Sequence, residues 1–315
     1  MASRTSFVQF ISNHARDEGL CNPLVEVVRL ELFLIDSLID LPISLSPAQT
    51  ISALGAIISA PSLAYVRKAG SSLLTKQLLR PHGVQGLLDV MFGEEDSSDD
   101  GMRLEKQEHI ARILMTTPAN MKATVSNTSF FCEFKFIVKL IFQEYFSLII
   151  PRVIHLLSGN MPASHKQAAS FTIYRAIVPK KPAQHQDASS IVLAMLHDPF
   201  LKLVDSSEQK LANTIEPCEA LSSIITLISN TEPSPIFISK ILSPILPSLY
   251  LLSYNLARYK TADPQLKASV NGLLLSWGKI VDQPEGVNVL WSILEAGQNS
   301  EWKYNTNGQL WRFEL

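Results

Sequence analysis

The chain alternates short apolar helical segments with breaks centred on proline. Between residues 23 and 41, apolar side chains recur at three- and four-residue steps, which is the periodicity of one face of an α-helix. Leu30, Phe33 and Leu34 widen that face, so we expect this first helix to be covered on more than one side. Pro42 follows the last periodic residue and ends the helix.

Proline and serine residues also mark where the following helices begin or break. Ser46 and Pro47 suit the N-cap and first position of a helix that runs to about residue 60. A turn at His197-Asp198-Pro199 separates two further helices. The same reasoning predicts helices over 62–79, 83–92, 102–116, 187–196, 200–204, 216–229, 235–258, 264–281 and 285–296, with 235–258 broken or kinked at Pro244 and Pro247.

The stretch from Glu144 to Ala176 indicates the architecture most clearly. It predicts two amphipathic helices joined by the loop SGNMPAS, in which Pro162 and Ser164 suit the start of the second helix. A helix pair of this kind cannot bury both faces alone and needs another pair stacked on it. The spacing of helix, proline turn and helix is close to that of HEAT or armadillo units, although no strict repeat is visible. The sequence therefore predicts an all-α, armadillo/HEAT-like solenoid of stacked helix pairs.

Strand-type alternation lies mostly at the C-terminus. Residues 301–304 and 309–313 flank Asn307-Gly308, a dipeptide that favours a hairpin turn, so we expect a short C-terminal β-hairpin. The resulting organisation is an N-terminal tail or short helix, a helical repeat region, and a hairpin tail, over residues 1–22, 23–296 and 297–315. Within the repeat region we expect exposed loops at the acidic segment 93–101 and the polar segment 179–186.

The composition limits the cellular locations and the kinds of binding partner that we expect. The chain is 46% hydrophobic and 18% charged, against a usual charged share of about 25%, which suits a chain buried on several sides. A net charge of −2 offers no general attraction to nucleic acid or anionic membranes, so we expect no direct nucleic-acid binding. Cys21, Cys132 and Cys218 lack the spacing of metal ligands, so we interpret them as reduced thiols in the core. Reduced thiols are typical of cytoplasmic and nuclear proteins, so we expect a cytoplasmic protein, and a nuclear location is also compatible.

Two apolar stretches resemble membrane spans only superficially. Residues 136–154 and 236–254 are both interrupted by proline and by charged side chains, whereas a spanning helix needs about 20 apolar residues with few charges. The N-terminal residues lack the apolar core and cleavage site of a signal peptide. We expect no transmembrane helix.

Few residues are candidates for a catalytic or ligand-binding role. The acidic segment 93–101 lacks the ligand spacing of an EF-hand. Gly83 and Gly86 lack the strand and the lysine of a phosphate loop, and Ser71 lacks a nucleophile elbow. The histidines, at 14, 82, 109, 155, 165, 185 and 197, contain no H-E-x-x-H pair. We therefore expect no catalytic, cofactor-binding or metal-binding residues, and no enzyme.

Two smaller features remain open. Lys180-Lys181 is a basic doublet that is too short for a nucleic-acid patch. Trp291, Trp302 and Trp311 favour a small local core around the hairpin, with a peptide-binding platform as the alternative.

Five segments, in the same order, resemble the RNA polymerase II assembly factor family, also called the transport and Golgi organisation protein 6 family. They are LLRPHGVQGLLDVMFGEE (78–95), EKQEHIARILMTTPANM (105–121), EYFSLIIPRVIHLL (144–157), KQAASFTIYRAI (166–177) and LHDPFLKL (196–203). The likeness covers most of residues 23–296, and the terminal WKYNTNGQLWRF resembles a segment that follows in fungal members.

The resemblance implies a non-enzymatic, protein-binding scaffold. Family members resemble armadillo/HEAT solenoids, are longer than this chain, and act in assembly and nuclear import of RNA polymerase II and in secretory-pathway organisation. RNA polymerase II subunits and transport factors are the implied partners, and a cytoplasmic protein that shuttles to the nucleus is the implied location. Golgi or endoplasmic-reticulum association in protein secretion is the alternative.

One segment departs from the family. A sequence like PANM there runs almost directly into EYFSLIIPRV, whereas here residues 125–143 intervene. Val125-Ser126 can be encoded by an intron start and Gln143 by an intron end. We hypothesise that this insert is a retained intron in the coding sequence; a genuine inserted helix is the competing interpretation. Separately, the part that follows these repeats in the family is missing here, so the resemblance implies that the chain is a fragment or a truncated gene model.

Overall fold

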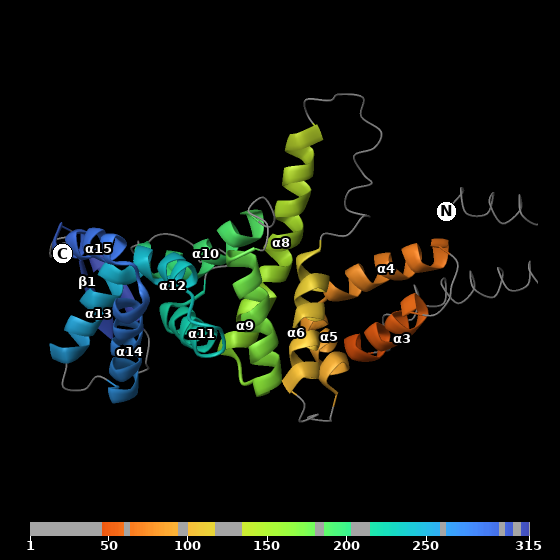
Figure 1. Ribbon diagram of the computed structural model, residues 1–315, viewed down its shortest axis with the longest axis horizontal. Helices are drawn as coiled ribbons and strands as arrows, with labels where there is room; N and C mark the ends of the chain where they lie inside the picture. The colour runs from red at the N-terminus through yellow and green to blue at the C-terminus, as the bar shows by residue number, and fades with distance from the viewer. Residues whose placement is uncertain are drawn as a thin grey trace, which may run out of the picture. The chain divides into compact units, whose positions relative to one another are not determined.

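The structure is a computed structural model that describes residues 46–59, 64–93, 100–116, 134–179, 186–202, 215–258, 263–295, 300–304 and 310–314. This part of the chain is predominantly α-helical, in agreement with the predicted all-α class (Figure 1). The chain divides into two compact units, Met1–Val90 and Met91–Leu315. The first helix expected from the sequence, over 23–41, lies outside the described residues.

The first unit is built on the helices α3 (Pro47–Ser59) and α4 (Ala64–Leu78), which pack on each other, and on most of α5 (Gly83–Phe92). Leu54, Val66 and Leu73 form the buried contact between α3 and α4. The predicted start of α3 is confirmed, because the hydroxyl of Ser46 accepts from the backbone N–H of Gln49 at 3.3 Å. The Gln49 side chain accepts from the Ser46 N–H in return at 3.2 Å, which completes a capping box.

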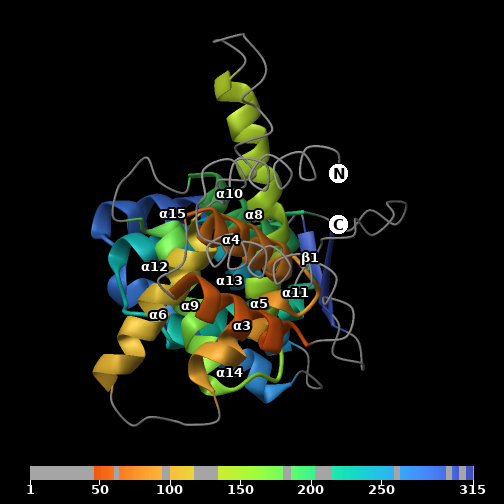
Figure 2. The same ribbon diagram turned by 90° about the vertical axis from the view of Figure 1, so that its right-hand side faces the viewer.

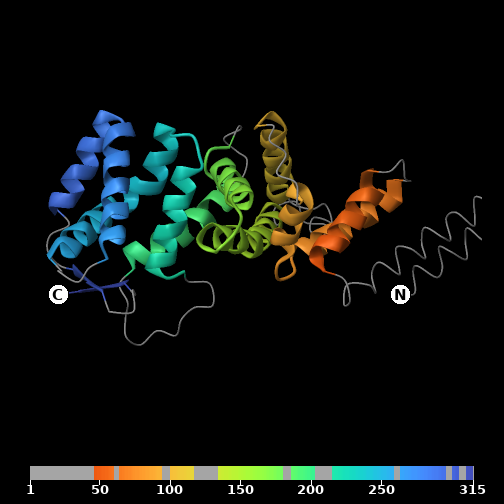
Figure 3. The same cartoon turned by 90° about the horizontal axis from the view of Figure 1, so that it is seen from below.

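The second unit holds the remaining elements. They are α6 (Asp100–Met115), α8 (Phe134–Ser158), α9 (Ala163–Ile177), α10 (Gln186–Leu201), α11 (Pro217–Ser229), α12 (Pro235–Leu242), the 3-10 turn η3 (Ser243–Ile245), α13 (Leu246–Arg258), α14 (Pro264–Ile280), α15 (Gln283–Glu295), β1 (Ser300–Tyr304) and β2 (Leu310–Glu314). The helices follow one another in chain order (Figure 3). Each of them packs mainly on helices that are near it in the sequence.

The core of this unit is formed from both helices of the predicted pair 144–176. On α8, Ile149, Ile150 and Ile154 are fully buried, and on α9 Ala168 and Ile173 are fully buried as well. Burial of a large aliphatic side chain contributes about 1.5 to 3 kcal/mol, so these positions supply much of the packing energy of the pair. α8 contacts α9, α10 and α11, which explains why the apolar side chains on it extend around more than one face.

Side chains from neighbouring helices satisfy the carbonyl groups at two helix ends. The buried Tyr145 hydroxyl donates to the carbonyl of Leu114 at 3.3 Å, in the last turn of α6. The Lys240 ammonium donates to the carbonyl of Ile177 at 3.0 Å, at the last residue of α9. Such carbonyls have no partner within their own helix, and the positive charge also complements the helix dipole.

The two strands pair antiparallel, with Trp302 opposite Arg312. Trp302 is buried; its indole N–H donates to the carbonyl of Ser248 on α13 at 3.1 Å, and its ring lies 6.1 Å from that of Phe200. The strand pair is therefore fastened to the helices next to it. The residues between the strands, which include the predicted Asn-Gly turn, lie outside the described part of the chain.

Several helix boundaries agree with the sequence prediction and two breaks do not. The break at Pro244 and the start of α14 at Pro264 are confirmed, and α11 starts at Pro217, one residue after the predicted Glu216. The predicted break at Pro247 is not found, since Pro247 lies in the first turn of α13. The predicted turn at His197-Asp198-Pro199 is wrong, since α10 continues through it to Leu201. Pro199 lies in the last turn of α10, where it removes one backbone hydrogen bond.

The burial of Leu196 and Phe200 on either side of this site favours the helical path over the local preference of proline. His197, also buried, adds a hydrogen bond between its Nε2 and the carbonyl of Ile241 at 2.9 Å. Tertiary packing has therefore overridden the local signal.

α8 also differs from expectation at its start. It begins at Phe134, inside the proposed insert, and not at Glu144. Its first turns extend beyond the neighbouring helices (Figures 1 and 2). The buried side chains that the structure describes on α8 begin at Tyr145.

Candidate functional site

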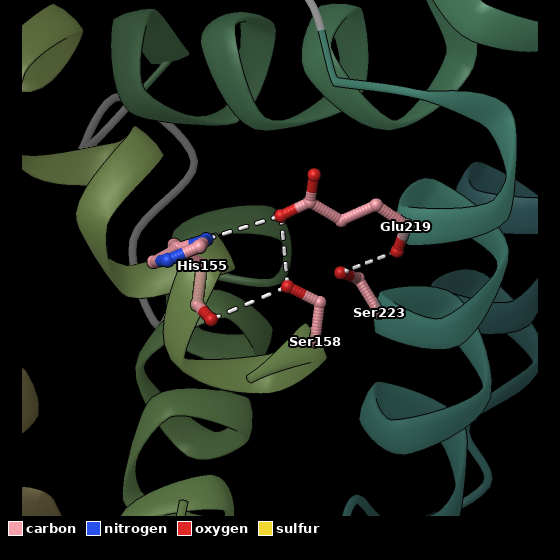
Figure 4. Close-up of polar contacts among 4 residues, drawn as sticks. All are labelled: His155, Ser158, Glu219 and Ser223. Carbon is pink, nitrogen blue, oxygen red and sulfur yellow. Dashed lines mark hydrogen bonds and ion pairs between the residues drawn. The ribbon is translucent and has the colours of Figure 1, made fainter. Parts of the chain in front are cut away.

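The most distinctive polar constellation lies between the end of α8 and the start of α11 (Figure 4). The carboxylate of Glu219 receives two hydrogen bonds on its Oε1 atom, from Nδ1 of His155 at 3.1 Å and from the hydroxyl of Ser158 at 2.9 Å. Ser158 also lies 3.3 Å from the carbonyl of His155, and the Ser223 hydroxyl donates to the carbonyl of Glu219 at 2.9 Å. We call these four residues the Glu219 cluster.

Local structure explains the positions in the Glu219 cluster. His155 and Ser158 are three residues apart, so they share one face of the last turn of α8. Glu219 lies in the first turn of α11, which starts at Pro217. An acidic side chain at a helix N-terminus and a histidine at a helix C-terminus both complement the helix dipole.

The cluster is exposed to solvent on the histidine side. The side chain of His155 is 75% exposed and that of Glu219 is 34% exposed. The contact is an ion pair only when the imidazole is protonated, and at this exposure it then contributes less than about 1 kcal/mol, because water screens it and two side chains lose freedom. The Glu219 cluster therefore fastens two helices weakly at their ends.

The order of the three groups also separates this cluster from a nucleophilic triad. In a triad the histidine accepts the proton of the serine hydroxyl, and the acid orients the histidine. Here the carboxylate stands between the two, and the hydroxyl of Ser158 donates to Glu219. The contacts thus direct the serine proton to a carboxylate oxygen and leave the hydroxyl without the imidazole base.

A second constellation joins four elements at the C-terminal end of the helical part. The carboxylate of Glu285 on α15 accepts from Ser239 and, at 2.7 Å, from Ser243. The hydroxyl of Ser243 accepts in turn from the indole N–H of Trp277 on α14 at 3.0 Å. These bonds fix the first turn of α15 against α12, η3 and α14, and we call them the Glu285 network.

The remaining described histidines each make separate contacts. His82 approaches the side chain of Gln85 at 3.3 Å and His109 that of Arg112 at 2.8 Å, both on the surface. The ring of His165 is buried and lies 5.9 Å from that of Phe92. Burial lowers the pKa of His197, so this imidazole is neutral at pH 7 and serves the packing of α10. His14 and His185 lie outside the described residues.

The glycines near residue 85 have a packing role. A Cβ on Gly86 would lie 2.9 Å from the backbone nitrogen of Ala48, at the start of α3. A Cβ on Gly83 would lie 2.1 Å from the carbonyl oxygen of Gln77. Both glycines therefore allow close backbone approach within the first unit. Ser71 donates to the carbonyl of Arg67 at 2.8 Å within α4, so its hydroxyl serves its own helix.

The tryptophans and the one cysteine among the described residues lie in different environments. Trp302 belongs to a local core, as the sequence predicted, whereas the same prediction is wrong for Trp291, which is 59% exposed. The side chain of Trp311 is not among those described. Burial raises the pKa of the Cys218 thiol, which favours the protonated form. Cys21, Cys132 and Lys180-Lys181 lie outside the described residues.

Among the described residues, no group of three or more His, Cys, Asp or Glu side chains could hold a metal ion. Within the same part of the chain, Pro235–Arg258 is long and apolar enough to cross a membrane, and half of its most apolar stretch is buried inside the protein. Core helices of soluble proteins share this length and composition.

Sequence reasoning did not find the Glu219 cluster or the Glu285 network. The partners of Glu219 lie 61 and 64 residues away in the chain, and those of Glu285 lie 42 and 46 residues away. The only local signal was the pairing of His155 with Ser158 on one helical turn. Comparison with known proteins adds no identity: no protein-family model, no curated protein and no solved structure matches this chain.

Proposed function

We propose that this chain is part of a non-enzymatic, protein-binding α-solenoid of the armadillo/HEAT type. The observation that carries the proposal is the packing of each helix on helices near it in the sequence. In the second unit the substantial contacts run from α6 to α9, from α8 to α9, α10 and α11, and from α13 to α14 and α15. Contacts restricted to near neighbours are the defining property of solenoids, whose continuous surfaces suit extended partners.

The polar constellations support a scaffold and not a reaction centre. The Glu219 cluster joins α8 to α11 and the Glu285 network joins α15 to α12, η3 and α14, and their hydrogen bonds are made within the protein. Arg175 of α9 pairs with Glu108 of α6, and Arg103 of α6 donates to Gln167 of α9, in the same manner. These side chains hold helices that are two to three elements apart in the chain against each other, which a binding surface built from stacked helices requires.

The resemblance to the RNA polymerase II assembly factor family gives this scaffold its proposed role. On that basis the protein acts in cytoplasmic assembly and nuclear import of RNA polymerase II, with polymerase subunits and transport factors as partners. It is cytoplasmic and shuttles to the nucleus. The five resembling segments carry packing residues, so the role rests on their number and order along the chain.

Affinity purification of the tagged protein from its own cells, followed by mass spectrometry, tests this role. We expect recovery of RNA polymerase II subunits together with import factors. A variant with a charge in the core, Ile154→Asp, is the matched control; Ile154 is fully buried, so the variant unfolds and loses the partners. Recovery of coat or Golgi proteins without polymerase subunits contradicts the proposal.

A second candidate is a membrane-associated factor in protein secretion and Golgi organisation. The observation that favours it is the apolar length of Pro235–Arg258. Extraction of membranes with alkaline carbonate separates the two candidates. Release of the protein into the soluble fraction contradicts a spanning helix, and retention in the pellet favours the secretory role.

A further inference from the structure

The last helix, α15, is apolar on the side that faces solvent. Val287, Leu290, Trp291 and Leu294 are 47%, 52%, 59% and 73% exposed. Their spacing of three, four and seven residues places them on one face of the helix, and we call them the α15 stripe. Amphipathic surface helices carry polar residues on this side, so the stripe is a surface suited to contact with another protein surface.

The orientation of the stripe is fixed by the opposite side of the same helix. α15 packs on α13, and Glu285 in its first turn is held by Ser239 and Ser243. Val289 and Ile293, on the inner side, are partly buried. The protein therefore holds α15 by one face and presents the stripe outward with a defined direction.

The area of the stripe suits the centre of a modest interface. At their exposed fractions, the four side chains present on the order of 400 Å² of apolar surface, within the range of the largest patch on a typical monomer, which is often functional. A standard interface buries about 800 Å² on each partner, of which about 65% is apolar in homodimers. The α15 stripe thus supplies most of the apolar part that such a dimer needs.

We propose that the stripe is the contact between two copies of this chain, related by a two-fold axis, with the two α15 helices antiparallel. Such pairing places Val287 opposite Leu294 of the second copy and Leu290 opposite Trp291. The two most central side chains then meet at the axis, as a self-complementary interface requires. No charged residue lies between Glu285 and Glu295, and Glu285 is engaged on the inner side, so no like charges face each other at the centre of the interface.

Sedimentation velocity of the whole chain over about 1 to 100 µM tests the proposal, since an interface of this size gives affinities in the micromolar range or tighter. The wild-type protein should shift from monomer to dimer with concentration. Trp291→Glu should weaken the dimer at least about 30-fold, because a central aromatic anchor carries much of the binding energy. Leu104→Glu is the matched control, since Leu104 on α6 is 57% exposed and lies outside the stripe. Unchanged circular dichroism shows that both variants are folded.

Cysteine cross-linking tests the register directly. In a background with Cys21, Cys132 and Cys218 replaced by serine, Leu290→Cys should form a covalent dimer under mild oxidation, because residue 290 lies next to the axis. Val287→Cys alone should not, whereas Val287→Cys combined with Leu294→Cys should. A wild-type chain that stays monomeric throughout, a dimer unaffected by Trp291→Glu, or efficient cross-linking by Val287→Cys alone overturns the proposal. A monomer whose stripe is protected only in a complex with another protein assigns the surface to that partner instead.

Discussion

At the scale of single residues, Tyr145 shows how one buried polar group ties two helices. Its hydroxyl donates to Leu114 in a buried site, and burial raises its pKa to about 12 from the ordinary 10.0. The folded state therefore keeps its proton at a pH where the unfolded chain loses it. By linkage, the stabilisation is complete below pH 10 and is lost as the pH rises towards 12.

This linkage gives a pH prediction. Between pH 10 and 12 the free energy of unfolding of the wild type should fall by on the order of 2 to 3 kcal/mol through this group. Tyr145→Phe should remove that part of the pH dependence while costing about 1 kcal/mol at pH 7 for the lost hydrogen bond. Urea unfolding of both proteins at several alkaline pH values measures the difference. Parallel curves for the two proteins contradict the assignment.

The Glu219 cluster makes a contrasting prediction, because it is exposed. A double-mutant cycle of His155→Ala and Glu219→Ala should give a coupling energy below about 1 kcal/mol at low salt. Sodium chloride should reduce this coupling further through screening. Chemical denaturation of the four proteins at two ionic strengths supplies the cycle. A coupling of several kcal/mol, insensitive to salt, shows that the pair is more buried than its exposure indicates.

At the scale of elements, the sequence predicted what depends on neighbours in the chain. The N-cap at Ser46, the start of α14 at Pro264 and the break at Pro244 were predicted, and each is encoded within a few neighbouring residues. The path of α10 through Pro199 was missed, because it depends on the burial of Leu196 and Phe200 among other helices. The Glu219 cluster was missed for the same reason: its members meet only after α8 and α11 have packed.

Two glycines inside helices provide a matched test of close packing between elements. A Cβ on Gly272, in α14, meets no described atom within 4 Å, so Gly272→Ala should stabilise the protein by about 0.5 to 1 kcal/mol through helix propensity. Gly86→Ala should instead destabilise it by about 1 to 3 kcal/mol, because the new Cβ meets the backbone of α3 at 2.9 Å. Thermal unfolding of both variants measures the two shifts. Shifts of the same sign contradict the close approach of α5 to α3.

At the scale of the whole molecule, packing between near neighbours in the sequence makes the protein tolerant of changes confined to one connection. In the solenoid that we propose, contacts between neighbouring helices stabilise the fold, so a segment that joins two helices can vary if those contacts persist. Residues 125–143 are such a segment by sequence. The first turns of α8, which belong to it, extend beyond the neighbouring helices (Figure 1).

Removal of this segment is therefore the sharpest test at this scale. A protein in which Thr124 is joined to Glu144 retains Tyr145 and every buried α8 side chain that follows, so it should fold with a midpoint of unfolding within a few degrees of the full chain. Deletion of an equally long piece beginning at Glu144 is the control, and it should abolish folding because it removes the buried face of α8. Transcript reads spliced from the codon of Thr124 to that of Glu144 would add that the shorter protein is the natural one. Uniform read depth across the segment, together with loss of folding on its removal, would establish it as a genuine part of α8, because a helix that starts at Phe134 would then be needed to position the core that begins at Tyr145.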